Sequence, residues 1–319
     1  MNKYPKVSII IPTYNTANYL AATIDSAIHQ SFTDYEIIVI DDGSTDETET
    51  ILDKYKNNIR VHKQLNQGPG AARNVGIQIA NGENLVFLDS DDLLHSGMLA
   101  IQTAYLDRNS DVDVVYSNGY RFKEDKKGHV KYKLLSKSGE VVKIPLDGNP
   151  ADYLISHNCF PPCVAMVRKR CVIEIGCFDE SLTTCEDWDL WFRIACNYKI
   201  SFVNGIAAYY RVRKGSNSDD KPRNIREHLR VMKKIEQSEF FKNANETLRS
   251  EFYYVKGILS LFIGEKENAR LCFNTSVDLN RSSIKAQSAQ ILFKLFGVRL
   301  KNIYRAKRII FGIHGIHPV

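Results

Sequence analysis

The chain has 319 residues, of which 44% are hydrophobic and 25% are charged, and its formal net charge is +6 at neutral pH. These proportions argue against a mainly disordered chain, and the length suggests two domains or one large domain with an appendage. No apolar run approaches the roughly 18 residues that a membrane-spanning helix requires. The amino-terminal residues lack the layout of a signal peptide, and the seven cysteines are scattered. We therefore expect a cytoplasmic protein with reduced thiols.

Charge divides the chain into two parts. Residues 1–222 contain 25 basic residues (Lys and Arg) and 29 acidic residues (Asp and Glu), a net charge of −4. Residues 223–319 contain 18 basic and 8 acidic residues, a net charge of +10. The polar stretch 214–222, with the sequence KGSNSDDKP, has the composition of a linker. We therefore predict one domain over residues 1–222 and a basic, helical C-terminal region over residues 223–319, with different partners.

The first part alternates between strand-like and helix-like segments. Short β-branched runs, about 25–30 residues apart as in βα units, begin at Val7, Tyr35, Ile59 and Asn84. Helix-period segments lie between them, and Ser44 with Glu47 has the spacing of a capping box for one of these helices. Because the strands lack polar alternation, we predict an α/β fold with a Rossmann-like, mostly parallel sheet and helices on both faces.

The regular alternation ends near residue 116. Residues 119–145 are polar and alternating, which predicts a solvent-facing hairpin with its turn at 125–128, and a second αβ stretch follows over about 150–213. Beyond the linker the pattern is helical. Residues 253–281 resemble one weak tetratricopeptide unit, and because a single unit cannot bury its own face, we expect a helical hairpin and not an array. Its packing residues would be Gly257, Ala269 and Phe273.

Acidic and polar residues follow three of the predicted strands. The first strand leads into PTYN at 12–15, the second into DDGSTD at 41–46, and the fourth into DSDD at 89–92. The carboxyl ends of parallel strands meet at one edge of the sheet, where such folds bind ligands, so these carboxylates should converge. Clustered carboxylates repel one another unless a cation joins them, and Mn²⁺ or Mg²⁺ uses carboxylates together with phosphate oxygens of a substrate. The pattern therefore predicts a divalent metal site.

Each of these motifs also has an ordinary structural interpretation. An Asp-Asp-Gly after a strand is often a turn with a helix cap, and an isolated Asp-x-Asp is often a solvated loop. The Gly-Pro-Gly at 68–70 fits a plain turn, and it is not a dinucleotide fingerprint because Arg73 stands where the third glycine would be. An acidic pair in the first turn of a helix, such as Glu186 and Asp187, is favoured by the helix dipole. The common location of the motifs favours a functional site.

Six segments in a fixed order resemble the family 2 glycosyltransferases with the GT-A fold. They are VSIIIPTYN, IDDGSTD, NQGPGAARNVGI, LVFLDSDD, GCFDESL and CEDWDLWFRIA. The resemblance covers residues 5 to about 213 and does not extend to the C-terminal region. It implies an inverting transferase that uses a nucleotide-diphospho-sugar as donor and Mn²⁺ or Mg²⁺ as cofactor.

The resemblance also implies roles for single residues at the nucleotide. Pro12 and Tyr14 would lie at the nucleoside. Asp41 would accept a hydrogen bond from the base, usually uracil, which predicts a UDP-sugar as donor. Arg73 would lie near the base or a phosphate, and Asp89 would contact the ribose or the metal.

The remaining roles concern the metal and the catalytic base. Asp91 would bind the metal, which as a Lewis acid stabilises the charge on the leaving diphosphate. Asp187, next to Glu186 in the nucleotide-sugar site, would take the proton of the acceptor hydroxyl. After the last strand the family often has Tyr-Arg-x-His, whereas this chain has Arg211 and Arg213 in that run, and we expect both in the nucleotide-sugar site. Arg213 can pair with a phosphate but cannot ligate a metal.

The acceptor is not specified by any residue. The resemblance implies a saccharide or a lipid-linked saccharide, in the synthesis of a bacterial surface polysaccharide or glycolipid. A nucleotidyltransferase is one alternative, but such an enzyme should have a glycine-rich basic loop at the position of PTYN. A nucleotide-sugar binding protein without activity is another alternative, and the presence of Asp89, Asp91 and Asp187 argues against it. The basic segment 289–313 fits a packed helix or an interfacial helix at an anionic membrane, and no nucleic-acid binding motif accompanies it.

Overall fold

The computed structural model describes residues 4–124, 130–134, 149–158, 160–213, 216 and 220–296. The chain forms two compact units. The first comprises Met1–Asp147 and Phe160–Lys214, and the second comprises Gly148–Cys159 and Gly215–Val319. The domains predicted over 1–222 and 223–319 remain predictions.

The first unit is built on one sheet with the strand order β3-β2-β1-β4-β8-β6-β9-β5, and β7 pairs with β6 outside this path. The strands are β1 Val7–Thr13, β2 Tyr35–Asp41, β3 Arg60–Lys63, β4 Asn84–Phe87, β5 Leu93–Leu94, β6 Val114–Glu124, β7 Val130–Leu134, β8 Ala165–Arg168 and β9 Ile200–Arg211. Strands β1 to β4 are parallel, whereas β8 is antiparallel to β4, and β6 is antiparallel to β8. Because the strand direction reverses twice, β6 runs in the same direction as β4. Strand β6 and its parallel neighbour β9 therefore end at the same edge of the sheet as β4.

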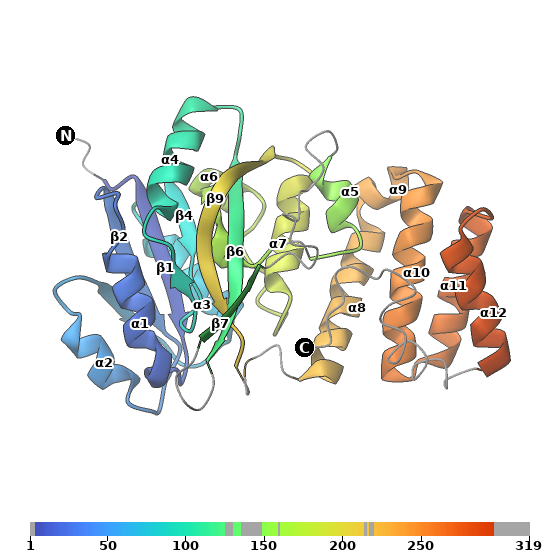
Figure 1. The fold of residues 1–319 in the computed structure, drawn as a ribbon, viewed down its shortest axis with the longest axis horizontal. Helices are drawn as coiled ribbons and strands as arrows, with labels where there is room; N and C mark the ends of the chain where they lie inside the picture. Colours follow the sequence, from blue (N-terminus) through green and yellow to red (C-terminus); the bar gives the residue numbers. More distant parts are fainter. Residues whose placement is uncertain are drawn as a thin grey trace. The chain divides into compact units, whose positions relative to one another are not determined.

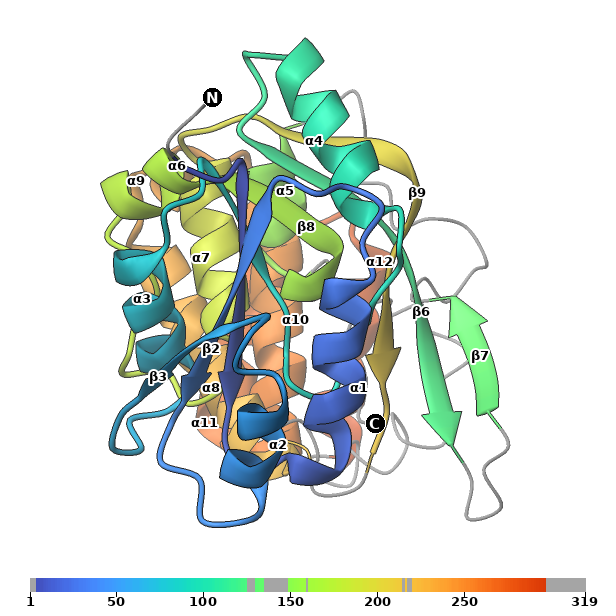
Figure 2. The same ribbon diagram turned by 90° about the vertical axis from the view of Figure 1, so that its left-hand side faces the viewer.

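Helices cover both faces of this sheet. They are α1 Ala17–Ile28, α2 Thr48–Lys54, α3 Pro69–Ile79, α4 Met98–Arg108, α6 Lys169–Glu174 and α7 Glu186–Ala195, together with the short 3₁₀ helix Pro162–Val164. Helices α1 and α4 lie on one face, and α3 and α7 lie on the other (Figures 1 and 2). All seven residues of β1 are buried because helices cover it on both sides, whereas the four residues of the edge strand β3 are exposed. The predicted α/β fold is confirmed, and the strands after β4 make the sheet mixed.

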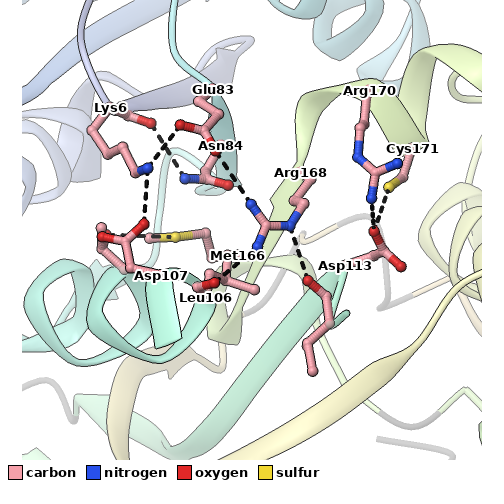
Figure 3. Close-up of polar contacts among 12 residues, drawn as sticks. Lys6, Glu83, Asn84, Leu106, Asp107, Asp113, Met166, Arg168, Arg170 and Cys171 are labelled. Carbon is pink, nitrogen blue, oxygen red and sulfur yellow. Dashed lines mark hydrogen bonds and ion pairs between the residues drawn. The ribbon is translucent and has the colours of Figure 1, made fainter. Parts of the chain in front are cut away.

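Arg168 fixes the antiparallel strand β8 in this sheet (Figure 3). Its Nε donates to the carbonyl of Val112 (2.9 Å) and its Nη2 to the carbonyl of Leu106 (2.8 Å). Its Nη1 forms an ion pair with Glu83 at 3.2 Å. Arg168 is the register partner of Asn84, the first residue of β4, so this network lies at the edge of the sheet opposite the acidic loops.

The predicted hairpin over residues 119–145 is only partly correct. Strand β6 begins at Val114 and pairs with β8 and β9 within the main sheet before it pairs with β7. Phe122 is only 4% exposed, so the hairpin is not solvent-facing throughout. Its burial follows from the position of β6 inside the sheet, where a helix covers the strand. The predicted turn at 125–128 and residues 135–145 lie outside the described residues.

The capping box predicted at Ser44 and Glu47 is wrong. Helix α2 has no side-chain cap at Glu47; instead, Asp46 accepts hydrogen bonds from the N–H groups of Thr48 (3.1 Å) and Ala17 (3.0 Å). Thr48 and Ala17 are the first residues of α2 and α1. One carboxylate therefore satisfies amide donors in the first turns of two helices, which a capping box within one helix cannot do.

The second unit is helical among its described residues. Its helices are α5 Pro150–Leu154, α8 Lys221–Gln237, α9 Glu239–Asn243, α10 Glu246–Ile263, α11 Lys266–Leu279 and α12 Ile284–Phe296, and α10, α11 and α12 lie side by side (Figure 1). A Cβ atom at Gly257 would lie 2.7 Å from the ring of Phe273, and Ala269 is fully buried, so these residues pack as predicted. The helical hairpin is confirmed. Beyond Phe296 the basic segment lies outside the described residues, and among them no helix has the length and apolarity to cross a membrane.

Candidate active site

The carboxyl ends of β1, β2 and β4 meet, as predicted. Thr13 and Asp41, the last residues of β1 and β2, are register partners, and the N–H of Asp42 donates to the carbonyl of Thr13 (2.9 Å). The hydroxyl of Thr16 lies 2.8 Å from that of Thr13 and donates to the hydroxyl of Ser90, in the loop after β4 (2.9 Å). This buried chain of hydroxyls joins the loops that follow β1 and β4.

The residues predicted at the nucleoside lie at the ends of β1 and β2. Pro12 is buried within β1, whereas Tyr14, just beyond the strand, is 48% exposed. Asp41 is 5% exposed, and its Oδ1 accepts a hydrogen bond from the N–H of Ser44 (2.9 Å). An exposed aromatic ring beside a fixed carboxylate offers a stacking surface and a hydrogen-bond acceptor. Contact of these residues with a nucleoside remains a prediction.

Asp42 has a structural role that the sequence did not reveal. Its Oδ1 accepts hydrogen bonds from Nε2 of Gln64 (2.7 Å) and from the N–H of Gln67 (2.9 Å), and its Oδ2 accepts from the N–H of Gly68 (2.8 Å). The backbone of Gly68 has a φ of 93°, which only glycine adopts readily. Asp42 therefore fixes the loop that leads into α3 and so helps to position Arg73.

Arg73 is the centre of a buried ion-pair triad. It lies in α3, its side chain is 4% exposed, and its guanidinium contacts Asp89 through Nη2 and Glu186 through Nη1, both at 2.5 Å. The guanidinium also lies 5.3 Å from the centre of the Phe178 ring. Burial lowers the pKa of Arg73, but Asp89 and Glu186 together raise it above its ordinary value. The triad joins α3, the loop after β4 and the first turn of α7, while a contact of Arg73 with base or phosphate remains a prediction.

Arg73→Gln should lower the free energy of unfolding by about 3–5 kcal/mol, because it leaves the carboxylates of Glu186 and Asp89 without their cation. Urea denaturation measures this change. Arg270→Gln is the matched control, because Arg270 is exposed and pairs with exposed Glu267, and such pairs contribute about 0–1 kcal/mol. Equal losses in the two variants would contradict a structural role for the triad.

Two arginines at the end of β9 and just beyond it bind the acidic loop after β4, which comprises residues 89–92. Nε of Arg213 forms an ion pair with Oδ2 of Asp91 at 2.6 Å. Arg211 donates from Nε to the carbonyl of Asp91 (2.8 Å) and from its N–H to Oδ1 of Asp92 (2.8 Å). The sequence placed Arg211 and Arg213 in the nucleotide-sugar site, and their contact with a donor remains a prediction. The structure adds that both residues hold the loop that carries the predicted metal ligand.

Aromatic rings support these two arginines. The guanidinium of Arg211 lies 4.4 Å from the centre of the Phe122 ring and 5.0 Å from that of Tyr19, in α1. The guanidinium of Arg213 lies 5.1 Å from the same Tyr19 ring. Such cation–π contacts are attractive and fix the planes of the guanidinium groups. Tyr19 therefore orients both arginines on the α1 face of the sheet.

Burial and mutual repulsion make the acidic loop receptive to a cation. Burial raises the pKa of Asp91, and the charge of Asp89 raises it further, whereas Arg213 lowers it. Burial also raises the pKa of Asp92 well above its ordinary value, and the charges of Asp91 and Asp89 add to this effect. A divalent cation at the loop would favour the charged form of these carboxylates.

The carboxylates of Asp89 and Asp91 fit a divalent metal that takes most of its ligands from the substrate. Each already has one oxygen engaged, Oδ1 of Asp89 by Arg73 and Oδ2 of Asp91 by Arg213, so a metal would use the second oxygens. In the described part of the chain, no group of three or more His, Cys, Asp or Glu is arranged to hold a metal ion. Two carboxylate oxygens completed by phosphate and water match the preference of Mg²⁺.

The predicted base lies in the first turn of α7. Asp187 is partly exposed, and its Oδ1 accepts a hydrogen bond from the N–H of Trp188 (2.8 Å). The helix is anchored beneath it, because Trp188 and Trp191 are at most 1% exposed and pack in the core. The preceding residue, Glu186, belongs to the Arg73 triad. Asp187 thus projects from a rigid helix whose first residue, Glu186, is linked to Asp89 through Arg73, and its role as base remains a prediction.

Two solved structures share the fold of this chain. TarS 1-349 of S. aureus superposes with a TM-score of 0.65 at 22% identity, covering 94% of this chain and 91% of that one. A mannosyltransferase of Pyrobaculum calidifontis, in complex with GDP-Man and Mn²⁺, superposes with a TM-score of 0.60 at 18% identity. The superposition covers 96% of this chain and 83% of the mannosyltransferase. These likenesses define the GT-A fold of the chain.

The sequence identifies the family. Residues 8–176 match the family described as Glycosyl transferase family 2. An uncharacterized glycosyltransferase of Rickettsia typhi is 33% identical over 261 residues, 82% of this chain and 78% of the relative. Glycosyltransferase GlyG of Streptococcus pneumoniae serotype 4 is 30% identical over 225 residues, 66% of this chain and 72% of the relative. The chain belongs to the family 2 glycosyltransferases.

Proposed function

We propose that this glycosyltransferase transfers a sugar, with inversion at the anomeric carbon, from a UDP-sugar to a saccharide or lipid-linked saccharide acceptor. The observation that carries the proposal is the Arg73 triad. Asp89 belongs to the loop at the donor edge of the sheet, and Glu186 directly precedes Asp187, so one buried guanidinium links the two. A donor phosphate at the loop and an acceptor hydroxyl at Asp187 would therefore react at a fixed separation.

Asp187 is the proposed general base. Its carboxylate takes the proton of the acceptor hydroxyl as that oxygen attacks the anomeric carbon, and the bond from this carbon to the diphosphate breaks. Because the hydroxyl attacks from the side opposite the diphosphate, an α-linked donor gives a β-linked product. A positioned carboxylate contributes typically about 10²–10⁴-fold to such a step.

Asp91 and Asp89 are the residues that would hold Mn²⁺ or Mg²⁺. When bound, the ion stabilises as a Lewis acid the negative charge that develops on the leaving diphosphate. Arg213 adds a permanent positive charge beside Asp91, at 2.6 Å. This charge belongs to the side chain itself, so it is present with or without a metal ion.

We expect the nucleotide of the donor to be uridine diphosphate. Uracil offers an N–H to a carboxylate such as Asp41, and thymine offers the same edge, whereas guanine differs. TarS of S. aureus has been crystallised with UDP and UDP-GlcNAc, and the Pyrobaculum mannosyltransferase with GDP-Man, so proteins of this fold bind nucleotides with either base. Calorimetric titration with UDP, dTDP and GDP in the presence of Mn²⁺ tests the proposal. The expected order of affinity is UDP, dTDP and GDP, and a preference for GDP would contradict it.

The basic segment 289–313 suggests where the acceptor is met. We propose that the enzyme acts in the cytoplasm and that this segment binds the anionic inner face of the membrane, which suits a lipid-linked acceptor in bacterial surface polysaccharide or glycolipid synthesis. Each basic residue near such a surface contributes about 1 kcal/mol. The full-length protein should therefore sediment with anionic liposomes, less so in high salt.

Neutralising the segment should abolish this sedimentation, for example with Lys301→Gln, Arg305→Gln and Arg308→Gln combined. The matched control replaces Lys242 and Arg270, two exposed basic residues of α9 and α11, which should not change it. If the unaltered protein stays in the supernatant at low salt, the segment is not a membrane anchor.

A further inference from the structure

Arg121, in β6, is a half-buried cation that lacks a partner among the described residues. Its Nε is buried without a hydrogen-bond partner there. Burial lowers the pKa of Arg121, and Tyr210 opposes that shift. By contrast, the guanidinium groups of Arg73 and Arg213 each have carboxylate partners. A desolvated charge without such compensation is costly, so the site gains by receiving an anion.

Strand register places Arg121 on the face of the sheet that α7 covers. Arg121 and Phe122 are opposite Tyr210 and Arg211 of the parallel strand β9. Phe122 and Arg211 contact each other on the face of the sheet covered by α1. Because successive side chains of a strand alternate between faces, Arg121 and Tyr210 point to the other face, where α7 lies (Figure 1).

The position along the strand brings Arg121 to the edge of the candidate active site. Strands β6 and β9 end at the same edge as β4, where the acidic loop begins. Tyr210, the register partner of Arg121, directly precedes Arg211, whose N–H binds Asp92 of that loop. Arg121 therefore lies at the same end of the sheet as the acidic loop. Its side chain is on the face of the sheet covered by α7, the helix that contains Asp187.

Lys123 adds a second basic residue on the face of Arg121. Lys123, two residues further along β6, lies on the same face and is exposed. The backbone register places Lys133 of β7 opposite Arg121 and Lys131 opposite Lys123. Neither β7 nor residues 114–123 of β6 contain an acidic residue. Arg121 and Lys123 are thus the charged residues of β6 whose side chains the structure describes, and both are basic.

We propose that Arg121, with Tyr210 and Lys123, forms a subsite for an anionic group of the acceptor, either a phosphate or a carboxylate. The guanidinium fork forms two parallel hydrogen bonds with such an oxyanion. The proposal rests on the proposed transfer reaction and gives it an acceptor class, an anionic saccharide. In the proposed reaction the donor diphosphate lies at Arg213 and Asp91, and Arg213 packs on Tyr19 at the α1 side of the sheet, so Arg121 would bind a separate group.

Binding of small anions to the UDP-saturated protein tests this subsite. Glycerol 1-phosphate and methyl glucuronide serve as probes for a phosphate and a carboxylate, and calorimetric or NMR titration measures their affinity. At least one probe should bind, and Arg121→Gln should weaken it by about tenfold or more, the effect of losing a charge-assisted pair. The affinity for UDP should stay unchanged. The probe that binds more tightly identifies the anion.

The matched control is Arg60→Gln, because Arg60 lies on the edge strand β3 and is already paired with Glu36. It should leave probe binding unchanged. The subsite is refuted if neither probe binds the unaltered protein, if Arg121→Gln binds both as well as that protein does, or if its affinity for UDP falls as much as that for the probe. Donor hydrolysis, measured separately, shows whether the transfer reaction itself fails.

Stability gives a second test that does not depend on a ligand. Arg121→Met removes a partly buried charge without removing an ion pair, so its denaturation midpoint in urea should equal or exceed that of the unaltered protein. A clearly lower midpoint would show that Arg121 has a structural partner, which would overturn the subsite.

Discussion

Asp187→Asn should reduce sugar transfer by about 10²–10⁴-fold, because the amide cannot take the proton of the acceptor hydroxyl. Donor affinity should stay unchanged, since the proposed base touches the acceptor and not the nucleotide. The variant should also fold normally, because Asn keeps an oxygen that can accept the hydrogen bond from the N–H of Trp188. Single-turnover transfer and UDP titration measure the two quantities separately.

Glu186→Gln is the informative comparison for this variant. Glu186 is buried and paired with Arg73, so its substitution should lower the stability of the protein as well as its activity. Asp187→Asn should lower activity alone. Weak donor binding with normal turnover in Asp187→Asn would show that Asp187 has another function and that the base lies elsewhere.

Asp91→Asn should lower turnover by about 10²–10³-fold, as expected when stabilisation of a developing negative charge is removed. One oxygen of Asp91 is engaged by Arg213, so the carboxylate offers the metal its other oxygen, and an amide is a much weaker ligand. Electron paramagnetic resonance of Mn²⁺ measures binding directly, and a chelator should mimic the substitution in the unaltered protein.

Asp111→Asn is the control for this second variant, because Asp111 is exposed and pairs with Lys199 away from the acidic loop. It should bind Mn²⁺ and turn over normally. Full activity of Asp91→Asn in the presence of a chelator would remove the metal from the mechanism. The arginines that contact the loop, Arg73, Arg211 and Arg213, would then supply its positive charge.

The convergence of the acidic loops was predictable from the sequence. Parallel strands end at one edge, so β-branched runs followed by acidic motifs are enough to bring Asp41 and Asp89 to that edge. The helical hairpin was predictable for a similar reason, since Gly257 and Phe273 are spaced as small and aromatic packing partners. Both predictions depend on local periodicity together with a general rule of topology.

The ion pairs of the site were not predictable in this way. Arg73 pairs with Glu186, which is 113 residues away, and Arg213 pairs with Asp91, which is 122 residues away. Sequence periodicity carries no information about which charges meet over such separations. The face occupied by Arg121 was also inaccessible, because the register between β6 and β9 shifts after Tyr116 and again after Asn118. Such irregularities change which side chains face a given helix.

The stereochemistry of donor hydrolysis tests the central claim most directly. Proton NMR can follow the purified protein with Mn²⁺ and a panel of α-linked UDP-sugars, and it identifies the anomer of the sugar that is released first. We expect UDP release from at least one donor, with the β-anomer formed before mutarotation, and loss of this activity in Asp187→Asn. First release of the α-anomer, or unchanged hydrolysis by that variant, would contradict an inverting transferase with Asp187 as its base.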